Sequence, residues 1–166
     1  PLVLMGYINP AMQYGMENFF KDAHHCGIDG IIIPDLPMYE YEQIYKSQFE
    51  KYQLENIFLI TPQTSIERIQ KIDEMTNSFI YVVSSNSITG SKSDNTVAQI
   101  QYFQRIKEMQ LKNPTVIGFG IKDKSTFDTA CAYANGAIIG SAFIQAIDKS
   151  NDLKTDISKF IQQIKA

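Results

Sequence analysis

Two short glycine motifs follow the last two apolar runs of the chain. Gly118-Phe119-Gly120 comes after Thr115–Ile117, and Gly140-Ser141 comes after Ala137–Ile139 and opens an expected short helix over Ala142–Ile147. Glycine lets a backbone N–H approach a phosphate oxygen because no Cβ intervenes, and a helix N-terminus adds unpaired N–H groups and a partial positive charge. Each motif alone is better explained as a tight turn. Together they favour a phosphate-binding site.

Two tyrosines and an aspartate also stand where expected strands end. Tyr7 and Tyr81 would each offer a substrate an aromatic wall and a hydroxyl, or would be ordinary core or rim tyrosines. Asp35 lies in a turn stiffened by two prolines, where its carboxylate would bind a substrate hydroxyl or N–H, act as a base, or cap a helix. Thr89-Gly90 offers a hydroxyl and another accessible N–H, although this motif alone is typical of a plain turn.

The histidines and cysteines predict neither a metal site nor a nucleophilic catalytic set. His24 and His25 lie at the end of an expected helix, where the helix dipole favours a protonated imidazole, and the chain has no other histidine. Cys26 and Cys131 lack the spacing of metal-binding or redox pairs. We expect both to be buried structural thiols in a reducing compartment, which favours a cytoplasmic location.

Composition limits the class of protein further. The 166 residues are 44% hydrophobic and carry a net charge of -3, which suits one domain over residues 1–166 with a sizeable core. A mildly acidic chain without a basic block argues against general binding to nucleic acid or to anionic membranes. The apolar runs are too short to predict a transmembrane helix.

Apolar runs alternate with amphipathic stretches six times along the chain. The runs are nearly continuous and rich in β-branched and aromatic residues, as in parallel strands that are covered on both faces. The expected strands are Leu2–Met5, Ile28–Ile33, Ile57–Ile60, Phe79–Val83, Thr115–Ile117 and Ala137–Ile139. The stretches between them predict helices, one of which begins at a capping-box pattern, Thr64-Ser65-Ile66-Glu67. The polar stretch Ser84–Asn95 predicts a loop over an active site or interface.

This alternation predicts an α/β protein with a parallel sheet, either an open doubly wound sheet or a (β/α)8 barrel. Length favours the open sheet, because six units fill 166 residues and a complete barrel needs about 250. The glycine motifs after the last two strands favour the barrel, and no glycine-rich fingerprint follows the first strand. Because the chain opens at an apolar run without an initiator methionine, we expect it to be part of a longer protein.

In their order and spacing, these motifs resemble the tryptophan synthase α subunit family from its third barrel strand to its C-terminus. The matching stretches are 2–10, 14–15, 27–37, 61–69, 79–84, 89–90, 118–121 and 140–142. The resemblance implies a (β/α)8 TIM barrel that is incomplete here, with about six βα units and the first two missing. It also implies a lyase of tryptophan biosynthesis, which cleaves indole-3-glycerol phosphate by a retro-aldol reaction to indole and glyceraldehyde 3-phosphate.

The same resemblance implies roles for single residues. The implied phosphate-binding residues are Gly90, Gly120, Gly140 and Ser141, and the implied indole pocket consists of Tyr7, Leu59 and Phe119. The hydroxyl of Tyr81 would lie near the reacting glycerol or indole. Thr89 would help to close the site, while Asn9, Asp35 and the loop 85–92 would face a partner subunit.

The implied partner is the β subunit in an α2β2 complex, where indole passes through a tunnel to pyridoxal phosphate held by the β subunit. The α chain itself would need no cofactor or metal. The family's general acid-base glutamate and its indole-binding aspartate would precede Pro1, so we expect the chain as given to be inactive by itself. Ser87 stands where the family usually has glycine, and Lys92 stands where it usually has arginine, which bears on loop closure.

Two other interpretations remain open from the sequence. Phosphoribosylanthranilate isomerase, indole-glycerol-phosphate synthase and pentose-phosphate epimerases are phosphate-binding barrels that share the terminal glycine loops. They do not usually share the Pro34–Pro37 turn or the spacing of Tyr81 to Thr89-Gly90. The third interpretation is an inactive scaffold fragment that binds phosphate or the partner without turnover.

Overall fold

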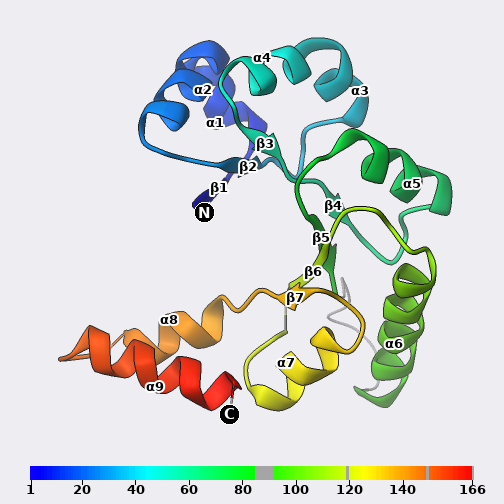
Figure 1. Cartoon of the computed structure of the whole chain (residues 1–166), viewed down its shortest axis with the longest axis vertical. Helices are drawn as coiled ribbons and strands as arrows, with labels where there is room; N and C mark the ends of the chain where they lie inside the picture. The colour runs from blue at the N-terminus through cyan, green and yellow to red at the C-terminus, as the bar shows by residue number, and fades with distance from the viewer. Residues whose placement is uncertain (85–91, 119, 149, 166) are drawn as a thin grey trace.

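The computed structural model describes residues 1–84, 92–118, 120–148 and 150–165, with only the backbone described for 92–96. Short strands alternate with helices along these residues (Figure 1). The strands are β1 (Val3–Met5), β2 (Gly30–Ile32), β3 (Glu55–Asn56), β4 (Leu59–Ile60), β5 (Ile80–Val83), β6 (Thr115–Gly118) and β7 (Gly136–Ala137). The helices are α1 (Ile8–Tyr14), α2 (Met16–His25), α3 (Met38–Glu40), a π-helical turn (Tyr41–Tyr45), α4 (Lys46–Lys51), α5 (Ile66–Met75), α6 (Lys92–Glu108), α7 (Lys124–Cys131), α8 (Ser141–Ile147) and α9 (Leu153–Lys165).

The strands confirm the predicted parallel pairing. Their order is β1-β2-β3 in one ladder and β4-β5-β6-β7 in the next, and every pair is parallel. The expected strand Ile57–Ile60 joins the two ladders: the Ile57 N–H donates to the Ile31 carbonyl (3.0 Å), and the Tyr81 N–H donates to the Phe58 carbonyl (2.9 Å). Pairing with β2 begins at Glu55, before the predicted start. Such an offset between the two neighbours of a strand is expected where strands tilt in a barrel.

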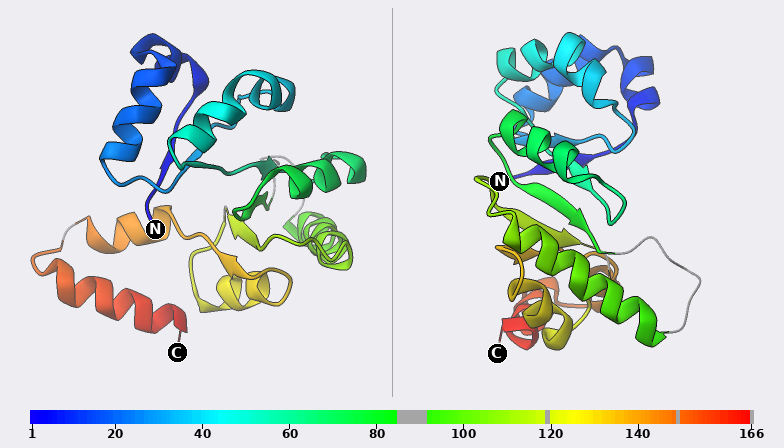
Figure 2. Two further views of the ribbon diagram at one scale, coloured as in Figure 1. Left: turned by 45° about the horizontal axis from the view of Figure 1, so that its top comes forward. Right: turned by 90° about the vertical axis from the view of Figure 1, so that its right-hand side faces the viewer.

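The helices lie along the outer side of the curved sheet (Figures 1 and 2). Alternate strand residues, including Ile31, Ile60 and Ile117, belong to a buried cluster shared with the helices. In this cluster the ring of Phe20 on α2 packs against that of Phe49 on α4 in a tilted arrangement, with ring centroids 4.7 Å apart. Both rings are almost fully buried, and burying a phenylalanine side chain stabilises a fold by about 1.5–3 kcal/mol.

The intervening strand residues form a smaller cluster on the opposite face of the sheet. Its buried members are Ile32, Ile57, Tyr81 and Val83, and Leu59 packs against them. Because side chains alternate along a strand, this face is separate from the one that the helices cover. The inner face therefore carries Tyr81 and Leu59 together.

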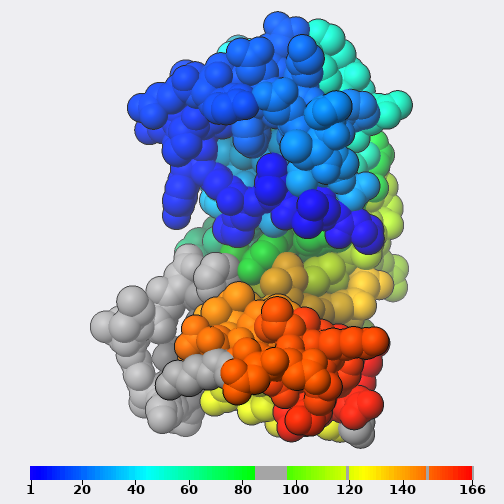
Figure 3. All heavy atoms as spheres, turned by 90° about the vertical axis from the view of Figure 1, so that its left-hand side faces the viewer, coloured from blue at the N-terminus to red at the C-terminus, as the bar shows by residue number. Residues whose placement is uncertain are grey.

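The N-terminal edge of the sheet is exposed to solvent. Among the described residues, β1 and β7 each pair on one side only. Leu4 is 38% exposed and Met5 is 55% exposed, so the expectation that the first strand is covered on both faces is wrong for this strand. An edge strand without a second neighbour leaves its apolar side chains in contact with solvent. Figure 3 shows this side of the molecule, with the N-terminal segment in blue above α8 and α9 in orange and red.

Local capping explains where two helices begin. The first turn of α5 is capped by Ser65, which accepts a hydrogen bond from the Arg68 N–H (3.3 Å). The expected cap Thr64 is wrong, because its hydroxyl accepts instead from the Thr61 N–H (2.9 Å) in the preceding turn. A full capping box that the sequence reading missed opens α7, where the Asp123 carboxylate accepts from the Thr126 N–H (2.9 Å).

Two other expectations need correction, and one helix lies where none was expected. Helix α6 begins at Lys92, so the expected loop Ser84–Asn95 is too long at its C-terminal end. Helix α1 was not predicted. Cys26 and Cys131 are exposed rather than buried, because Cys26 caps the end of α2 and Cys131 is the last residue of α7.

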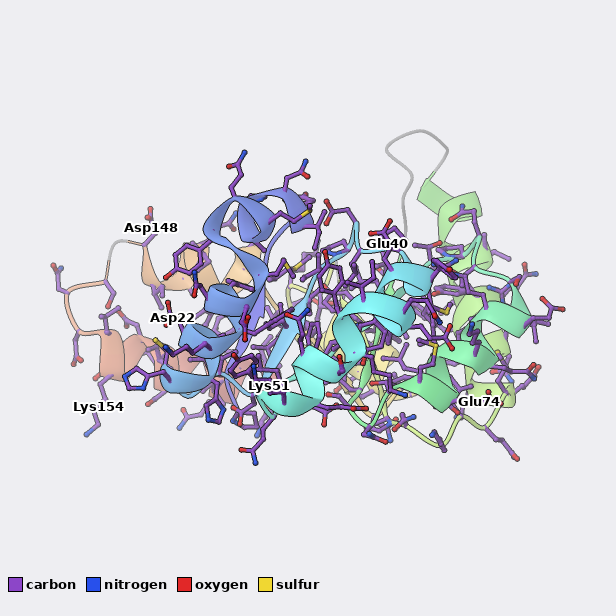
Figure 4. The ribbon with its side chains drawn as sticks, turned by 90° about the horizontal axis from the view of Figure 1, so that it is seen from above. Asp22, Glu40, Lys51, Glu74, Asp148 and Lys154 are labelled. Atoms are coloured by element: carbon purple, nitrogen blue, oxygen red, sulfur yellow. The ribbon has the colours of Figure 1, made fainter. Side chains whose placement is uncertain are left out.

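The outer surface carries charges of both signs. Figure 4 shows charged side chains around the helices, including Lys51 on α4, Glu74 on α5 and Lys154 on α9.

No helix in the part of the chain that the structure describes is long and apolar enough to cross a membrane.

Candidate functional site

The carboxyl ends of β5, β6 and β7 meet at one cavity of about 390 Å³. Four of the predicted site residues line it: Tyr81, Gly120, Gly140 and Ser141. The other lining residues are Ile121, Lys122, Ile138, Ala142 and Gln145. The parallel order of the three strands explains this convergence, because their carboxyl ends must lie side by side at the same edge of the sheet. A cavity of this size is within the usual range for a small-molecule site.

The ring of Tyr81 lies against a glycine of the neighbouring strand, β6. It is 6% exposed on the inner face of β5 and belongs to the cluster with Ile32, Ile57 and Val83. Its ring lies over Gly118 of β6, where a Cβ would lie 2.6 Å from Cε1 of the ring and nearer still to Cζ and Oη. Only glycine at position 118 therefore leaves room for this orientation of the tyrosine.

Burial raises the pKa of the Tyr81 phenol above its ordinary value of 10.0. The cause is the loss of water around the phenolate form, which is charged and needs solvation. The hydroxyl consequently stays protonated at neutral pH and can donate a hydrogen bond to an oxygen in the cavity.

The two glycine corners present backbone rather than side chains to the cavity. Gly120 has a φ of +77°, a conformation that strongly favours glycine. A Cβ on Gly140 would meet no atom within 4 Å, so the space in front of this residue is open. Gly140 precedes α8 and provides no side-chain cap. The first N–H groups of a helix have no partner within the helix, and those of α8 are placed at the wall of the cavity.

Of the three residues predicted to line an indole pocket, the structure describes Tyr7 and Leu59, which have different surroundings. Leu59 packs in the inner cluster beside Tyr81. Tyr7 is 67% exposed and lines a different, largely apolar cavity of about 510 Å³ between β1, α1 and α2. Phe119 lies outside the described residues. The shared pocket of Tyr7, Leu59 and Phe119 therefore stays a prediction, with Leu59 the member that lies next to Tyr81.

The two residues predicted to face a partner lie next to each other. The Asp35 carboxylate accepts a hydrogen bond from the Ile8 N–H (3.0 Å) and so caps α1 from a distant part of the chain. Asn9 is the next residue of this helix and is exposed, as is Asp35. The structure thus gives Asp35 the helix-capping role that the sequence left open, and places Asn9 beside it.

Four predicted residues lie outside the described residues or are described by their backbone alone. Thr89, Gly90 and Ser87 lie outside the described residues, and Lys92 is described only as part of the α6 backbone. Within the described ranges, no group of three or more His, Cys, Asp or Glu side chains is placed to hold a metal ion.

Sequence reasoning missed three features near the cavity. Lys122 and Gln145 line it, although neither belongs to a glycine motif. The Ser84 N–H donates to the Gly118 carbonyl (3.1 Å), and the Gln99 side chain of α6 donates to the Ser84 carbonyl (3.3 Å), which ties the end of β5 to β6 and α6. Lys122 follows Gly120 by two residues, a spacing that could have identified it.

Comparisons with known proteins give consistent results. The family model described as "Tryptophan synthase alpha chain" matches residues 1–166. The tryptophan synthase alpha chain of Flavobacterium psychrophilum is 56% identical over 164 residues, a match that covers 99% of this chain and 64% of that protein. The corresponding protein of Christiangramia forsetii is 53% identical over 166 residues, covering 100% of this chain and 64% of that protein. The chain therefore spans a little less than two thirds of these relatives.

Solved structures share the fold. A tryptophan synthase A-subunit from Pyrococcus furiosus matches with a TM-score of 0.82 at 29% identity, covering 99% of this chain and 66% of that chain. A tryptophan synthase complex from the same organism matches with a TM-score of 0.79 at 29% identity, covering 99% of this chain and 65% of that chain. The incomplete (β/α)8 barrel is thereby confirmed, and the open doubly wound sheet is excluded.

Proposed function

The chain belongs to the tryptophan synthase alpha chain family, and on that premise we propose that it supplies the phosphate-binding part of a lyase active site. The reaction is the retro-aldol cleavage of indole-3-glycerol phosphate to indole and glyceraldehyde 3-phosphate. The single observation that carries this proposal is the convergence of Tyr81, Gly120, Gly140 and Ser141 on one cavity.

The two glycine corners suit a phosphate monoester. Backbone N–H groups at Gly120, Gly140 and Ser141 would donate to the phosphate oxygens, and the start of α8 would add a partial positive charge. Gly90, with Thr89, would complete the phosphate site from the loop after β5. This arrangement fixes one end of the substrate, so that the glycerol chain extends toward Tyr81.

Tyr81 is the described side chain best placed to contact the reacting part of the substrate. Its protonated hydroxyl would donate to a glycerol oxygen or lie against the indole, and Leu59 beside it would provide an apolar wall. The family resemblance implies the same role for Phe119. Cleavage also requires a proton at C3 of indole and removal of a proton from a glycerol hydroxyl. No carboxylate is among the described residues that line this cavity. We therefore expect the acid-base glutamate and aspartate of the family to act from outside the matched motifs, and the 166 residues by themselves to bind without turnover.

Partner binding belongs to the same proposal. Asp35, which accepts from the Ile8 N–H, and Asn9, the next residue of α1, would face a tryptophan synthase β subunit in an α2β2 complex. Pyridoxal phosphate would be held by that subunit, and the α chain would use no cofactor of its own. A cytoplasmic location would follow from its role in amino-acid biosynthesis.

The test is the release of indole from indole-3-glycerol phosphate by the full-length protein, with and without the β subunit. We expect indole release that the β subunit stimulates, and no turnover of phosphoribosylanthranilate. Absence of indole release with the β subunit present would contradict the proposal. The 166-residue chain is assayed in parallel, and substantial turnover by it would show that the acid-base groups are within these residues.

A further inference from the structure

We infer that Lys122 supplies the positive charge of the phosphate site, as a binding residue that acts beside the backbone N–H groups. This inference rests on the proposed function, because it assigns a ligand to the same cavity. Lys122 is the only charged residue among the described residues that line the cavity, and it follows the Gly120 corner by two positions.

A phosphate ligand would be attracted by the positive charge of Lys122. The phosphate group of a phosphomonoester carries between one and two negative charges at neutral pH, because its second pKa is about 6. The chain as a whole has a net charge of -3, so its overall field does not attract such an anion. Neutral N–H groups orient a phosphate, whereas an ammonium near it adds a direct attraction between opposite charges. Lys122 is exposed, so this attraction acts through solvent and is of moderate strength.

The backbone at Lys122 is fixed by the capping box of α7. The Thr126 hydroxyl accepts hydrogen bonds from the Lys122 N–H (3.0 Å) and from the Asp123 N–H (3.1 Å). These bonds hold the start of the side chain at the cavity wall. The lysine is therefore anchored at its backbone while its ammonium group remains free to follow the ligand.

Neighbouring charges leave the Lys122 ammonium available. Asp123 is the adjacent carboxylate, and its oxygens accept hydrogen bonds from the N–H and the hydroxyl of Thr126 (2.9 and 2.7 Å). These hydrogen bonds are also the main cause of its lowered pKa, to which Lys122 contributes least. In the described part of the chain, Lys122 forms no ion pair. Lys124, two residues on, is paired with Asp128 at 3.1 Å.

Gln145 adds a second polar side chain to the cavity without adding charge. It lies four residues after Ser141, on the same side of α8, and lines the same cavity. Lys122 from the β6–α7 connection and Gln145 from α8 thus line the same cavity as the two glycine corners. The β6–α7 connection follows β6 and α8 follows β7, and these two strands are adjacent in the sheet (Figure 1).

The experiment measures the binding of glycerol 3-phosphate to the full-length protein by calorimetry, with glycerol as the ligand that lacks phosphate. We expect Lys122→Met to weaken binding of glycerol 3-phosphate about three- to tenfold, and Lys122→Arg to retain most of it. Lys124→Met is the matched control, because it removes the same charge two residues away, and we expect it to leave binding unchanged. The loss in Lys122→Met should shrink as salt is raised to about 0.5 M.

A kinetic measurement separates binding from chemistry. Because Lys122 would contact the phosphate in both the ground state and the transition state, Lys122→Met should raise KM for indole-3-glycerol phosphate with little change in kcat. Urea unfolding of each variant confirms that the fold is intact.

Each outcome decides a different question. If the unaltered protein binds glycerol 3-phosphate and Lys122→Met binds it equally well, the role of Lys122 is wrong and the proposed function stands. If Lys122→Met and Lys124→Met weaken binding equally, the effect is one of overall charge and the inference is again wrong. If the unaltered protein binds no glycerol 3-phosphate, the phosphate site of the proposed function fails, and the role of Lys122 fails with it.

Discussion

The ring of Tyr81 occupies the space that any side chain on Gly118 would need. The two residues are diagonal neighbours on β5 and β6, since Tyr81 is paired with Val116 and Gly118 lies two positions further along. A Cβ on Gly118 would lie within 2.6 Å of the ring. The glycine therefore determines where the hydroxyl of Tyr81 points, although it contributes no group to the cavity.

This contact makes Gly118→Ala a sensitive change. The added methyl group should displace the ring, lower the free energy of unfolding by about 1–3 kcal/mol and reduce the proposed lyase activity of the full-length protein. Urea unfolding and indole release measure the two effects. Gly136→Ala is the control in the adjacent strand, because its Cβ would meet Val116 at 3.9 Å, an ordinary contact.

A double-mutant cycle tests whether the ring is the cause. In a Tyr81→Ala background the obstruction is gone, so Gly118→Ala should cost much less stability than it does alone. An equal cost in both backgrounds would mean that the backbone of Gly118, and not the ring of Tyr81, imposes the requirement for glycine.

The hydroxyl of Tyr81 can be tested separately from its ring. Tyr81→Phe keeps the aromatic wall and removes the donor, so we expect kcat/KM for indole release to fall about fivefold, the effect of losing a hydrogen bond worth about 1 kcal/mol. The exposed Tyr39 provides the control variant, Tyr39→Phe. If kcat/KM is unchanged in Tyr81→Phe, the residue is an apolar wall only.

We predict that ionisation of the buried Tyr41 phenol lowers the free energy of unfolding at high pH. Burial, followed by the charges of Glu55 and Glu50, raises the pKa of its phenol from 10.0 to about 12. A folded-state pKa above the unfolded value gives stability that is complete below pH 10 and is lost as the pH rises toward 12, and because solvent screens part of the effect, the loss is at most about 2–3 kcal/mol.

Substitution isolates the contribution of Tyr41. The free energy of unfolding of Tyr41→Phe should fall less between pH 10 and pH 12 than that of the unaltered chain, as measured by urea unfolding across this range. Tyr39→Phe, at a side chain that is 72% exposed, should behave like the unaltered chain. Parallel pH profiles for all three proteins would contradict the assignment.

Asp73 holds the connection between α6 and β6. Its carboxylate accepts hydrogen bonds from the backbone N–H groups of Lys112 (2.9 Å) and Asn113 (3.0 Å) and from the Asn113 side chain (2.9 Å). Asp73→Ala would leave these donors without their partner, so we expect a loss of about 1–3 kcal/mol in the free energy of unfolding. Glu74→Ala changes the adjacent exposed carboxylate and should have little effect. Equal stability of the two variants would show that water replaces the carboxylate without cost.

The sequence predicted the elements well because hydrophobic periodicity is a local property. The runs around Ile31, Val82 and Ile117 became parallel strands, and the stripe from Met16 to Ala23 became α2. Burial was predicted less well at the edges, because the exposure of Leu4 and Met5 depends on which strands lie beside β1.

The residues of the candidate site were also predicted only in part. Glycine motifs identified Gly120 and Gly140, because backbone access requires a particular residue type. Lys122 and Gln145 were missed because lysine and glutamine are common on any surface, and only the adjacency of two connections in space gives them a shared cavity. Ser65 rather than Thr64 caps α5 because the hydroxyl of Thr64 already has a partner in the turn before it, a competition that spacing alone does not reveal.

Asp35 offers the test that links the fold to partner binding. Its carboxylate caps α1 through the Ile8 N–H, whereas Tyr7, the residue before the helix, provides no side-chain cap. Asp35→Ala should therefore loosen α1, with faster hydrogen exchange in Ile8–Tyr14 and a loss of about 0.5–2 kcal/mol, whereas Asp35→Asn should keep much of the cap. If Asn9 contacts the β subunit, Asp35→Ala should also weaken binding of that subunit, while Asn9→Ala should weaken binding without changing exchange in α1. Weaker binding in Asp35→Ala with unchanged exchange would mean that Asp35 contacts the partner directly and does not act by capping the helix.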